Sequence, residues 1–435
     1  MKIALLGLGY VGLANMAVLS SLSHEVIGFD IDEIKIKELN EDKFIFDEDA
    51  IAKALQKKRR KWVATSKISD LKDIDIFFFA LPTPKGKNGE CDTSIIEKTI
   101  EDLLALLEGK KNPIYFVIRS TVEIGFADSL KNKLSKYPMQ IHVISLPEFV
   151  AEGTTYIDEK NPYRMVIGAS NRGDFDLIRE IRKDALYAGV PFFEMSNISA
   201  ELTKYAANSF LATKISFINS LARLSDKIGA NILDVSMGIG SDPRIGSSML
   251  GSGIGYGGAC FPKDTVALAK LANKNDSPLP LIEETIKINE SQPTYFLNKI
   301  KKEMGSLKNK KIGVLGLAYK QGISDIRSSL SIDIISSLIR EGAKIKAFDY
   351  SLMARKAFKG IFPGIDFASS VLEAAKGMDA IIFLTNDRRF KEIKENDLLL
   401  NMEGRYIFDG RNIFSLNAFP HFNYCSIGRR TTKAK

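Results

Sequence analysis

The sequence predicts an α/β protein with two doubly wound parallel sheets, joined by a helical domain that contains a long central helix. Three observations predict this fold. Short apolar runs alternate with helical stretches in residues 1–196 and again in residues 301–427. The segment between them, residues 197–300, has helical periodicity and no strand pattern, and the strand and turn that open the chain are repeated where the last third begins. At 435 residues the chain exceeds the size of a single core, so several domains are expected.

Residues 1–196 are predicted to form the first doubly wound sheet. Apolar runs mark the strands, and longer amphipathic stretches between them mark the helices. Alternation of this kind produces a parallel sheet covered by helices on both faces. Strands are expected at residues 2–6, 25–29, 62–65, 74–81, 114–119, 142–146 and 165–168, and helices at 13–22, 93–107 and 175–186.

Residues 197–300 are predicted to form the helical domain. Ser199 is expected to cap a helix that runs to residue 228, with Glu201 favourably placed in its first turn. A helix of ~45 Å is longer than one small domain, which makes it a candidate dimer contact. Shorter helices are expected at 262–272 and 281–289. The apolar residues that define the long helix are Leu202, Ala206, Leu211, Ile215, Ile218, Leu221 and Leu224.

Residues 301–427 are predicted to form the second sheet, with strands at 344–348, 380–384 and 406–408. It opens on an internal repeat, because residues 311–319 (KIGVLGLAY) match residues 2–10 (KIALLGLGY). The repeat breaks where Ala318 replaces a glycine and Gln321 replaces another, so this copy is not expected to bind a dinucleotide in the same way. The basic residues 428–435 are expected to form a flexible tail.

The composition is that of an ordinary globular protein, with 45% hydrophobic and 26% charged residues and a net charge of +8. The basic run 57–61 is interpreted as a solvated helix end, and no nucleic-acid-binding signature supports a nucleic-acid partner. Three cysteines do not make a disulfide framework, which favours a reducing, cytoplasmic location. No run of about 18 apolar residues predicts a membrane span. The three histidines lack the spacing of metal ligands, so no metal is expected.

The first turn carries a dinucleotide fingerprint. Gly7-Leu8-Gly9-Tyr10-Val11-Gly12 has the G-x-G-x-x-G spacing and lies between a strand and a helix, as in a Rossmann domain. The first glycine makes the turn, the second admits the pyrophosphate, and the third lets the helix pack on the strand. Asp30 ends the next strand and would accept the ribose hydroxyls, which favours NAD over NADP, and Lys35 could help to bind phosphate.

A second motif surrounds Cys260. Glycines precede this thiol and Pro262 follows it, which predicts a loop that becomes a helix N-terminus at the cysteine. The helix dipole and Lys263 would favour the thiolate. Asp264 is either a proton acceptor beside the thiol or a first-turn carboxylate stabilised by the dipole alone. Together with a nicotinamide site, such a thiol suggests an oxidation through a covalent thioester.

Other candidates lie on the long helix and at strand ends. Lys204 and Asn208 are four residues apart, so they form either a donor pair for an oxyanion or an ordinary exposed pair. Glu148 and Glu152 follow a predicted strand and are placed to face a cofactor, because ligands collect at the carboxyl ends of parallel strands. Two further turns, at Thr83 and at Ser120-Thr121, end strands at the same edge, although simple turn chemistry also explains them.

Taken in order, these motifs resemble the UDP-glucose/GDP-mannose dehydrogenases from residue 1 to about residue 415. The set is completed by Pro147-Glu148-Phe149, Asp325-Ile326-Arg327-Ser328-Ser329 and Asp409-Gly410-Arg411. The resemblance implies an NAD-dependent, four-electron oxidation of a nucleotide sugar from alcohol to carboxylate at carbon 6. It also implies a homodimer.

The resemblance also implies residue roles. Cys260 would be the nucleophile, Lys204 and Asn208 would stabilise the oxyanion, and Asp264 would handle protons. Glu148 and Thr121 would serve hydrolysis. The cofactor would contact Gly7, Gly9, Tyr10, Val11, Gly12, Asp30, Lys35, Thr83, Thr121, Glu152, Lys263 and Arg327. The substrate would contact Glu148, Phe149, Glu152, Lys204, Asn208, Gly253, Tyr256, Gly257, Lys320, Arg411 and, across a dimer interface, Arg244.

Within the family, residues 242–246 (DPRIG) resemble the UDP-glucose members, which implies UDP-glucose as substrate, with UDP-glucuronate and two NADH as products. GDP-mannose or a UDP-N-acetylhexosamine is the alternative substrate. A β-hydroxyacid dehydrogenase is a second alternative, although neither a second sheet nor an essential thiol is expected there. A nucleotide-sugar-binding protein without activity is a third, and the intact set of candidate catalytic residues argues against it.

Overall fold

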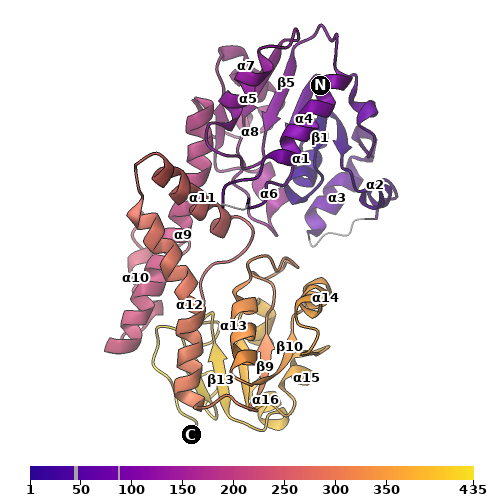
Figure 1. Ribbon diagram of the computed structural model, residues 1–435. Coiled ribbons are helices and arrows are strands. Elements are labelled where there is room, and N and C mark those ends of the chain that lie inside the picture. The colour runs from indigo at the N-terminus through magenta and orange to yellow at the C-terminus, as the bar shows by residue number, and fades with distance from the viewer. Residues whose placement is uncertain (44–47, 87–88) are drawn as a thin grey trace. The chain divides into compact units, whose positions relative to one another are not determined.

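A computed structural model describes residues 1–43, 48–86 and 89–435 of the chain (Figure 1). The predicted α/β fold is confirmed, with two mostly parallel sheets and a long helix. The chain divides into two compact units, Met1–Ala207 and Asn208–Lys435. The division falls inside the long helix α9, Asn197–Ile228, so each unit contains one part of that helix.

The sheet of the first unit has the strand order β3-β2-β1-β4-β5-β6-β7-β8. β1 lies inside it, and its side chains alternate between the two faces, with Ile3 and Leu5 in one core and Ala4 and Leu6 in the other. The strands are parallel except where β6 pairs with β7 in the antiparallel sense. Their bounds are β1 Lys2–Leu6, β2 Glu25–Phe29, β3 Trp62–Thr65, β4 Ile76–Phe79, β5 Ile114–Ile118, β6 Ile141–Ser145, β7 Met165–Gly168 and β8 Phe192–Met195.

Helices cover both faces of this sheet. Residues of α1, α3, α7 and α8 share one core, and residues of α4 and α5 share the other. The helix expected at 175–186 is in fact two helices that meet at Arg182, whose buried guanidinium donates to the Glu159 carboxylate at 2.6 Å. The bounds are α1 Tyr10–Ser21, α2 Glu33–Asn40, α3 Asp49–Lys57, α4 Ser94–Leu106, α5 Phe126–Leu134, α6 Thr155–Lys160, α7 Arg172–Ile181 and α8 Lys183–Tyr187.

The sheet of the second unit has the order β11-β10-β9-β12-β13-β14, and all of its strand pairs are parallel. The predicted strands are present, and β11 and β14 extend the sheet at its two edges. Its strands are β9 Lys311–Leu315, β10 Lys344–Phe348, β11 Asp366–Phe367, β12 Ala380–Phe383, β13 Tyr406–Asp409 and β14 Asn423–Ser426.

The helix expected at 281–289 is much longer. α12 runs from Pro280 to Met304 and continues through Pro293, past the domain boundary predicted at residue 300. A proline inside a helix costs about 3 kcal/mol, but the buried face of α12 continues beyond it with Phe296 and Ile300 at helical spacing. The other helices are α10 Ile232–Gly240, α11 Phe261–Lys274, α13 Leu330–Arg340, α14 Leu352–Ile361, α15 Val371–Ala375 and α16 Glu395–Asn401.

Helix α9 begins two residues earlier than expected, at Asn197. The N–H of Ser199 donates to the Ser196 hydroxyl at 3.2 Å, so Ser196 caps the helix and the prediction of Ser199 as the cap is wrong. The predicted apolar stripe is also only partly buried. Ile218 is fully buried, whereas Leu202 and Leu224 are 44% and 52% exposed.

The internal repeat is preserved in the backbone. Gly7 and Gly316 adopt the same left-handed conformation, with φ of 91° and 94°. Asp30 accepts the N–H of Leu8 at 2.9 Å, and Asp349 accepts the N–H of Leu317 at 2.7 Å. The copies then diverge, because α1 follows the first turn directly, whereas α13 begins only at Leu330. The second turn therefore lacks the helix N-terminus that receives a pyrophosphate in a Rossmann domain.

The C-terminal segment 428–435 does not match the expected flexible tail. Arg429 is 3% exposed, and its guanidinium donates to the Phe414 carbonyl at 2.9 Å and to the Ser426 hydroxyl at 2.8 Å. Further along, Lys433 pairs with Glu303 at 2.5 Å. Phe414 lies 15 residues from Arg429 and Glu303 lies 130 residues from Lys433, so contacts outside the segment tie it to the second unit. In the described parts of the chain, no helix is long and apolar enough to cross a membrane.

Candidate active site

The turn between β1 and α1 fits a dinucleotide. A Cβ on Gly7 would lie 2.6 Å from the Ala80 carbonyl oxygen, and one on Gly12 would lie 1.9 Å from the Gly7 carbonyl oxygen. A Cβ on Gly9 would meet nothing within 4 Å. Packing therefore requires the first and third glycines, while the second borders open space at the start of α1, where Tyr10 and Val11 form the first turn. A helix N-terminus beside such a space suits the pyrophosphate of NAD.

Asp30 follows β2 at the same edge of the sheet. Its carboxylate accepts the N–H of Leu8 at 2.9 Å, the N–H of Asp32 at 3.1 Å and the Lys35 ammonium at 2.8 Å. Burial alone would raise the pKa of Asp30, but Lys35 and the two N–H donors together hold it below its usual value. A charged carboxylate here suits ribose hydroxyls and repels a 2′-phosphate. Lys35, which is predicted to help bind phosphate, pairs with Asp30 at 2.8 Å in this structure.

The turns after β4 and β5 are tied together. The Thr83 hydroxyl donates to the Thr121 carbonyl at 2.7 Å, and the Cys91 thiol lies 3.0 Å from the same carbonyl. The neighbouring Ser120 hydroxyl donates to the Leu81 carbonyl at 2.7 Å. The two predicted site residues Thr83 and Thr121 are therefore neighbours.

Lys204 contacts the turn that follows β6. Its ammonium donates to the Glu148 backbone carbonyl at 2.7 Å and to the Glu148 carboxylate at 2.9 Å, and it lies 5.6 Å from the centre of the Phe149 ring. Lys204 is 3% exposed, so it is not the surface lysine of the alternative interpretation. Burial would raise the pKa of Glu148, but the charge of Lys204 and its hydrogen bond lower it below the usual value. Glu152 lies in the same turn, half-buried, before α6.

In the second unit, Cys260 lies where the sequence predicts, as the N-cap of α11 with Pro262 in the first turn. Cys260 is exposed to solvent. Asp264, one turn further on, is 1% exposed and accepts the Asn208 side-chain N–H at 2.6 Å and the Lys263 ammonium at 2.8 Å. Two hydrogen bonds therefore stabilise the Asp264 carboxylate in addition to the helix dipole. Asn208 is only 7% exposed, so it is not the exposed residue of the alternative interpretation.

The glycines before Cys260 pack against the chain itself. A Cβ on Gly257 would lie 2.3 Å from the Ser328 carbonyl oxygen, and one on Gly258 would lie 2.7 Å from the Tyr319 ring. The close packing of the chain on itself therefore already requires glycine at these two positions. They make room for the loop between β9 and α13.

Buried amide side chains hold this glycine loop, and the sequence interpretation missed them. Asn219 of α9 accepts the N–H of Gly253 at 2.8 Å, and Gln292 of α12 donates to the carbonyl of Gly253 at 2.8 Å. Asn289 of α12 makes two bonds to the backbone of Tyr256, at 2.8 and 3.0 Å. The sequence did contain a signal for these contacts, because Asn219, Asn289 and Gln292 are polar residues on otherwise apolar faces of α9 and α12. Burial raises the pKa of the Tyr256 phenol to about 12, so it stays neutral.

The basic residues of the second unit that are predicted to bind the nucleotide sugar or NAD differ in exposure. Arg411 donates to the Gly255 carbonyl at 2.7 Å, and burial lowers its pKa to about 10, which leaves it charged. Arg327 pairs with Asp325 at 2.6 Å, and Arg244 pairs with its neighbour Asp242 at 2.6 Å. The Arg244 side chain is 87% exposed. Lys320 is half-buried in the loop after β9.

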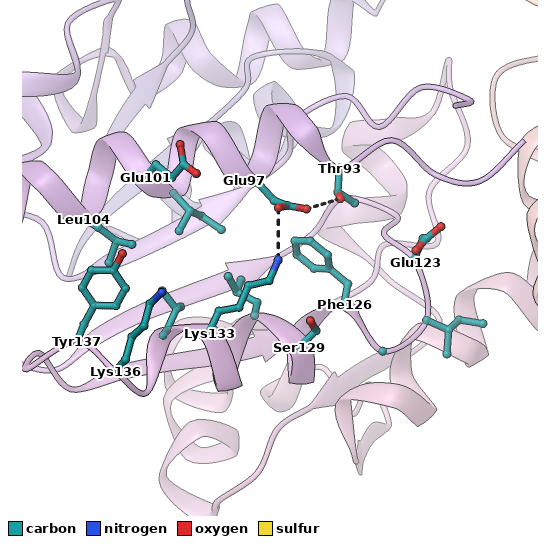
Figure 2. A pocket seen from close by; sticks show the side chains of 15 residues that line it. Thr93, Glu97, Glu101, Leu104, Glu123, Phe126, Ser129, Lys133, Lys136 and Tyr137 are labelled. Atoms are coloured by element: carbon teal, nitrogen blue, oxygen red, sulfur yellow. Dashed lines mark hydrogen bonds and ion pairs between the residues drawn. The ribbon is translucent and has the colours of Figure 1, made fainter. Parts of the chain in front are cut away.

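A separate cavity of about 450 Å³ lies between α4 and α5 in the first unit (Figure 2). At its edge the Glu97 carboxylate accepts the Thr93 hydroxyl at 2.9 Å and pairs with Lys133 at 3.5 Å. None of the predicted site residues lines it. Among the described residues, no group of three or more His, Cys, Asp or Glu side chains is arranged to hold a metal ion.

Known proteins match the chain along nearly its whole length. Residues 1–186, 198–291 and 313–416 match, in turn, the NAD binding, central and UDP binding domains of the UDP-glucose/GDP-mannose dehydrogenase family. The first match assigns NAD as the cofactor. UDP-glucose 6-dehydrogenase TuaD of Bacillus subtilis is 36% identical over 98% of this chain and 93% of its own length. UDP-glucose 6-dehydrogenase of Rickettsia typhi is 34% identical over 99% of this chain and 100% of its own.

Solved structures have the same fold. A UDP-glucose dehydrogenase of Pyrobaculum islandicum superposes with a TM-score of 0.89 at 25% identity, covering 98% of this chain and 97% of that one. A UDP-D-ManNAc dehydrogenase of Pyrococcus horikoshii gives a TM-score of 0.86 at 25% identity and 99% coverage of both chains. With three consecutive domain matches and relatives above one-third identity along the whole chain, this protein belongs to the UDP-glucose/GDP-mannose dehydrogenase family.

Proposed function

We propose that this enzyme oxidises UDP-glucose at carbon 6 to UDP-glucuronate and forms two NADH for each sugar. The observation that carries the proposal is the position of Cys260, an exposed cysteine at the N-terminus of α11. One turn further along the helix lies the Asp264 carboxylate, which accepts a hydrogen bond from the Asn208 side chain. The UDP-glucose 6-dehydrogenases among its relatives, at 36% and 34% identity, support the choice of sugar.

In this proposal Cys260 holds the half-oxidised sugar. NAD, when bound, supplies the hydride acceptor for both oxidations. The first oxidation converts the alcohol into an aldehyde, and the Cys260 sulfur then adds to the aldehyde carbon to form a thiohemiacetal. Its oxidation leaves a thioester, and water then breaks the carbon–sulfur bond to release the carboxylate and restore the thiol. A helix N-terminus favours the thiolate that this addition needs.

Lys204 and Asn208 would stabilise the negative oxygen that develops at carbon 6. A buried ammonium can act in this way only if it stays charged, and the Glu148 carboxylate at 2.9 Å provides the opposite charge. Asn208 is oriented by its bond to Asp264 at 2.6 Å. Asp264 would take up protons through water, and Glu148 with Thr121 would serve the hydrolysis of the thioester.

The remaining predicted contacts concern binding. Lys320 and Arg411 would bind the nucleotide diphosphate, a proposal supported by the match of residues 313–416 to a UDP binding domain. Arg327 would reach NAD. The exposed Arg244 would reach the sugar of a second subunit. A cytoplasmic location stays a prediction from the cysteine content.

We also propose that the enzyme is a homodimer through α9. Within the second unit, four large apolar side chains of this helix are exposed and follow one another at intervals of seven, seven and four residues, which places them on one face. Such a face is suited to a second copy of the same helix. They are Phe210, Phe217, Leu224 and Ile228, at 65%, 51%, 52% and 67% exposure.

The stoichiometry of NADH tests the reaction. With limiting UDP-glucose, two NADH per sugar and no free aldehyde are expected, and one NADH with free aldehyde would contradict the thioester. Cys260→Ala should abolish acid formation, while Cys425→Ala, the removal of a buried thiol that the proposal does not use, should retain it. Parallel assays with GDP-mannose and UDP-N-acetylmannosamine decide between the sugars.

A further inference from the structure

Glu201 is a buried carboxylate of α9 that none of the proposed steps uses. It is 4% exposed, and its two oxygens accept hydrogen bonds from outside its own helix. The donors are the N–H of Gly125 at 2.6 Å, the N–H of Ala127 at 3.0 Å and the Ser145 hydroxyl at 3.3 Å. Gly125 and Ala127 belong to the start of α5, and Ser145 ends β6. One side chain therefore fastens α9 to two other elements.

The capping of α5 depends on this distant residue. Its N-cap is Gly125, with φ of 95° and no side chain to accept the first N–H groups. Glu201 satisfies two of them and places negative charge at the positive end of the helix dipole. This differs from the sequence expectation, in which Glu201 would favour the N-terminus of its own helix.

Asn197 makes a second connection one turn earlier on α9. Its side-chain oxygen Oδ1 accepts the N–H of Ser145 at 3.1 Å, and its side-chain Nδ2 donates to Asp128 of α5 at 2.9 Å. On the neighbouring strand β7, a Cβ on Gly168 would lie 2.8 Å from the Asn197 Cα, so the strand and the helix are in close contact. These contacts hold the first turns of α9 against the end of the sheet, so that the helix can neither slide along its axis nor rotate about it.

Lys204 leaves α9 on the same side as Glu201, because the two are three residues apart. Its ammonium binds Glu148, which lies three residues beyond Ser145. Helix α9 and the end of β6 are therefore joined at two successive points. Between them lies a cavity of about 10 Å³, lined by Glu201, Lys204 and Thr121 among others, which is close to the space that one water molecule needs.

We infer that Glu201 is a positioning residue: by fastening α9 to α5 and β6, it sets the place of Lys204 relative to Glu148. This inference rests on the proposed function, because the place of Lys204 affects the rate only if its charge acts in the reaction. A carboxylate suits the role, since all of its hydrogen-bonding sites are acceptors, whereas a glutamine of the same size offers one acceptor oxygen and a donor amide. Burial raises the pKa of Glu201 to about 6, so it is ionised above that pH.

Asp174 of α7 provides a matched control, because its carboxylate contacts the same strand, β6. It is 2% exposed, and its carboxylate binds His142 of β6 at 2.7 Å, near the strand end opposite Ser145. Like Glu201, it ties a helix to β6, but none of the proposed catalytic residues contacts it.

The experiment compares kcat and KM in Glu201→Gln, Glu201→Ala and Asp174→Asn, below the Tm of every variant. In Glu201→Ala, kcat with UDP-glucose should fall about tenfold or more, because small displacements of a catalytic group are costly, while KM for NAD stays within about twofold. Glu201→Gln should lie between parent and Glu201→Ala, and it carries the test if the alanine variant does not fold. Asp174→Asn should lower Tm but keep kcat.

A parental kcat in both Glu201 variants, with only Tm reduced as in Asp174→Asn, would overturn the inference, because Glu201 would then be purely structural. A fall in KM for NAD or UDP-glucose that matches the fall in kcat would also overturn it, since the slow step would then have lost no transition-state stabilisation. A parent enzyme that forms no NADH from UDP-glucose would instead defeat the proposed function, and this inference with it.

Discussion

Gly7, Gly9 and Gly12 meet three different constraints within one turn. Gly7 needs a left-handed backbone and lies against the Ala80 carbonyl, and Gly12 lies against the Gly7 carbonyl. Gly9 has an ordinary φ of −79° and open space beyond its Cα. The fold therefore requires two of these glycines, whereas packing places no demand on the third, which the proposed contact with the cofactor pyrophosphate would explain.

Substituting Gly9 and Gly12 in separate variants should distinguish the glycine needed for cofactor binding from the glycine needed for folding. Gly9→Val should keep a Tm close to the parent but weaken NAD binding about tenfold or more, because its side chain fills the space for the pyrophosphate. Gly12→Val should fail to fold or lose several kcal/mol of stability, because its Cβ would lie 1.9 Å from a carbonyl oxygen. Thermal unfolding and NAD titration measure the two effects. Parental NAD affinity in Gly9→Val would argue against this turn as the pyrophosphate site.

Glu201 should make stability depend on pH in a defined direction. Burial raises its pKa from 4.5 to about 6, so the folded state holds the proton more tightly than the unfolded state does. Its contribution is therefore fully present below about pH 4.5 and is lost as the pH rises through about 6. Between these values the parent should lose about 1–2 kcal/mol relative to Glu201→Gln, measured by denaturant unfolding across that range. A constant difference between parent and variant would contradict the raised pKa.

At the scale of elements, polar side chains on helices fix the loops around the candidate site. Asn219, Asn289 and Gln292 hold the glycine loop, and Glu201 holds the start of α5. Each bond is made to a backbone group that would otherwise be buried without a partner, which is costly. The loops therefore owe their shape to helices that lie far from them in sequence.

The C-terminal segment should contribute to stability through Arg429. Arg429→Ala removes a buried guanidinium and leaves the Phe414 carbonyl with one donor fewer, so a loss of about 2–4 kcal/mol is expected. Arg430→Ala, the change of an exposed neighbour, should cost much less. Urea unfolding of both variants measures the difference. Equal, small effects would restore the expectation of a flexible tail.

At the scale of the whole molecule, the exposed face of α9 sets the expected assembly. Phe217→Asp places a charge at the middle of that face and should convert the dimer into monomers, because a buried unpaired charge is costly in an interface. Leu400→Asp, the same change at an 84% exposed leucine of α16, should leave the assembly intact. Light scattering after size-exclusion chromatography measures both masses. A monomeric parent would contradict the proposed dimer.

Sequence alone predicted the parts of the molecule that depend on local signals. The strand, turn and helix at Gly7–Gly12 and the helix start at Cys260 follow from glycine and proline spacing, and both are present. The long helix α12 was underestimated, because Pro293 signals a break that the packing of Phe296 and Ile300 overrides.

Contacts between residues far apart in sequence could not be predicted from the sequence alone. No sequence signal near Gly257 indicates that the Ser328 carbonyl packs against it. None near Arg429 indicates that its guanidinium donates to the Phe414 carbonyl. The role of Glu201 was missed for the same reason, since its partners lie 74 and 76 residues away.

The difference between the two glycine turns limits redesign. Gly316 and Asp349 adopt the same arrangement as Gly7 and Asp30, but a loop that leads to α13 follows the second turn where a helix follows the first. Restoring glycine at Ala318 and Gln321 would therefore not recreate a nicotinamide-nucleotide cradle. An engineer would have to transplant the whole turn together with its helix.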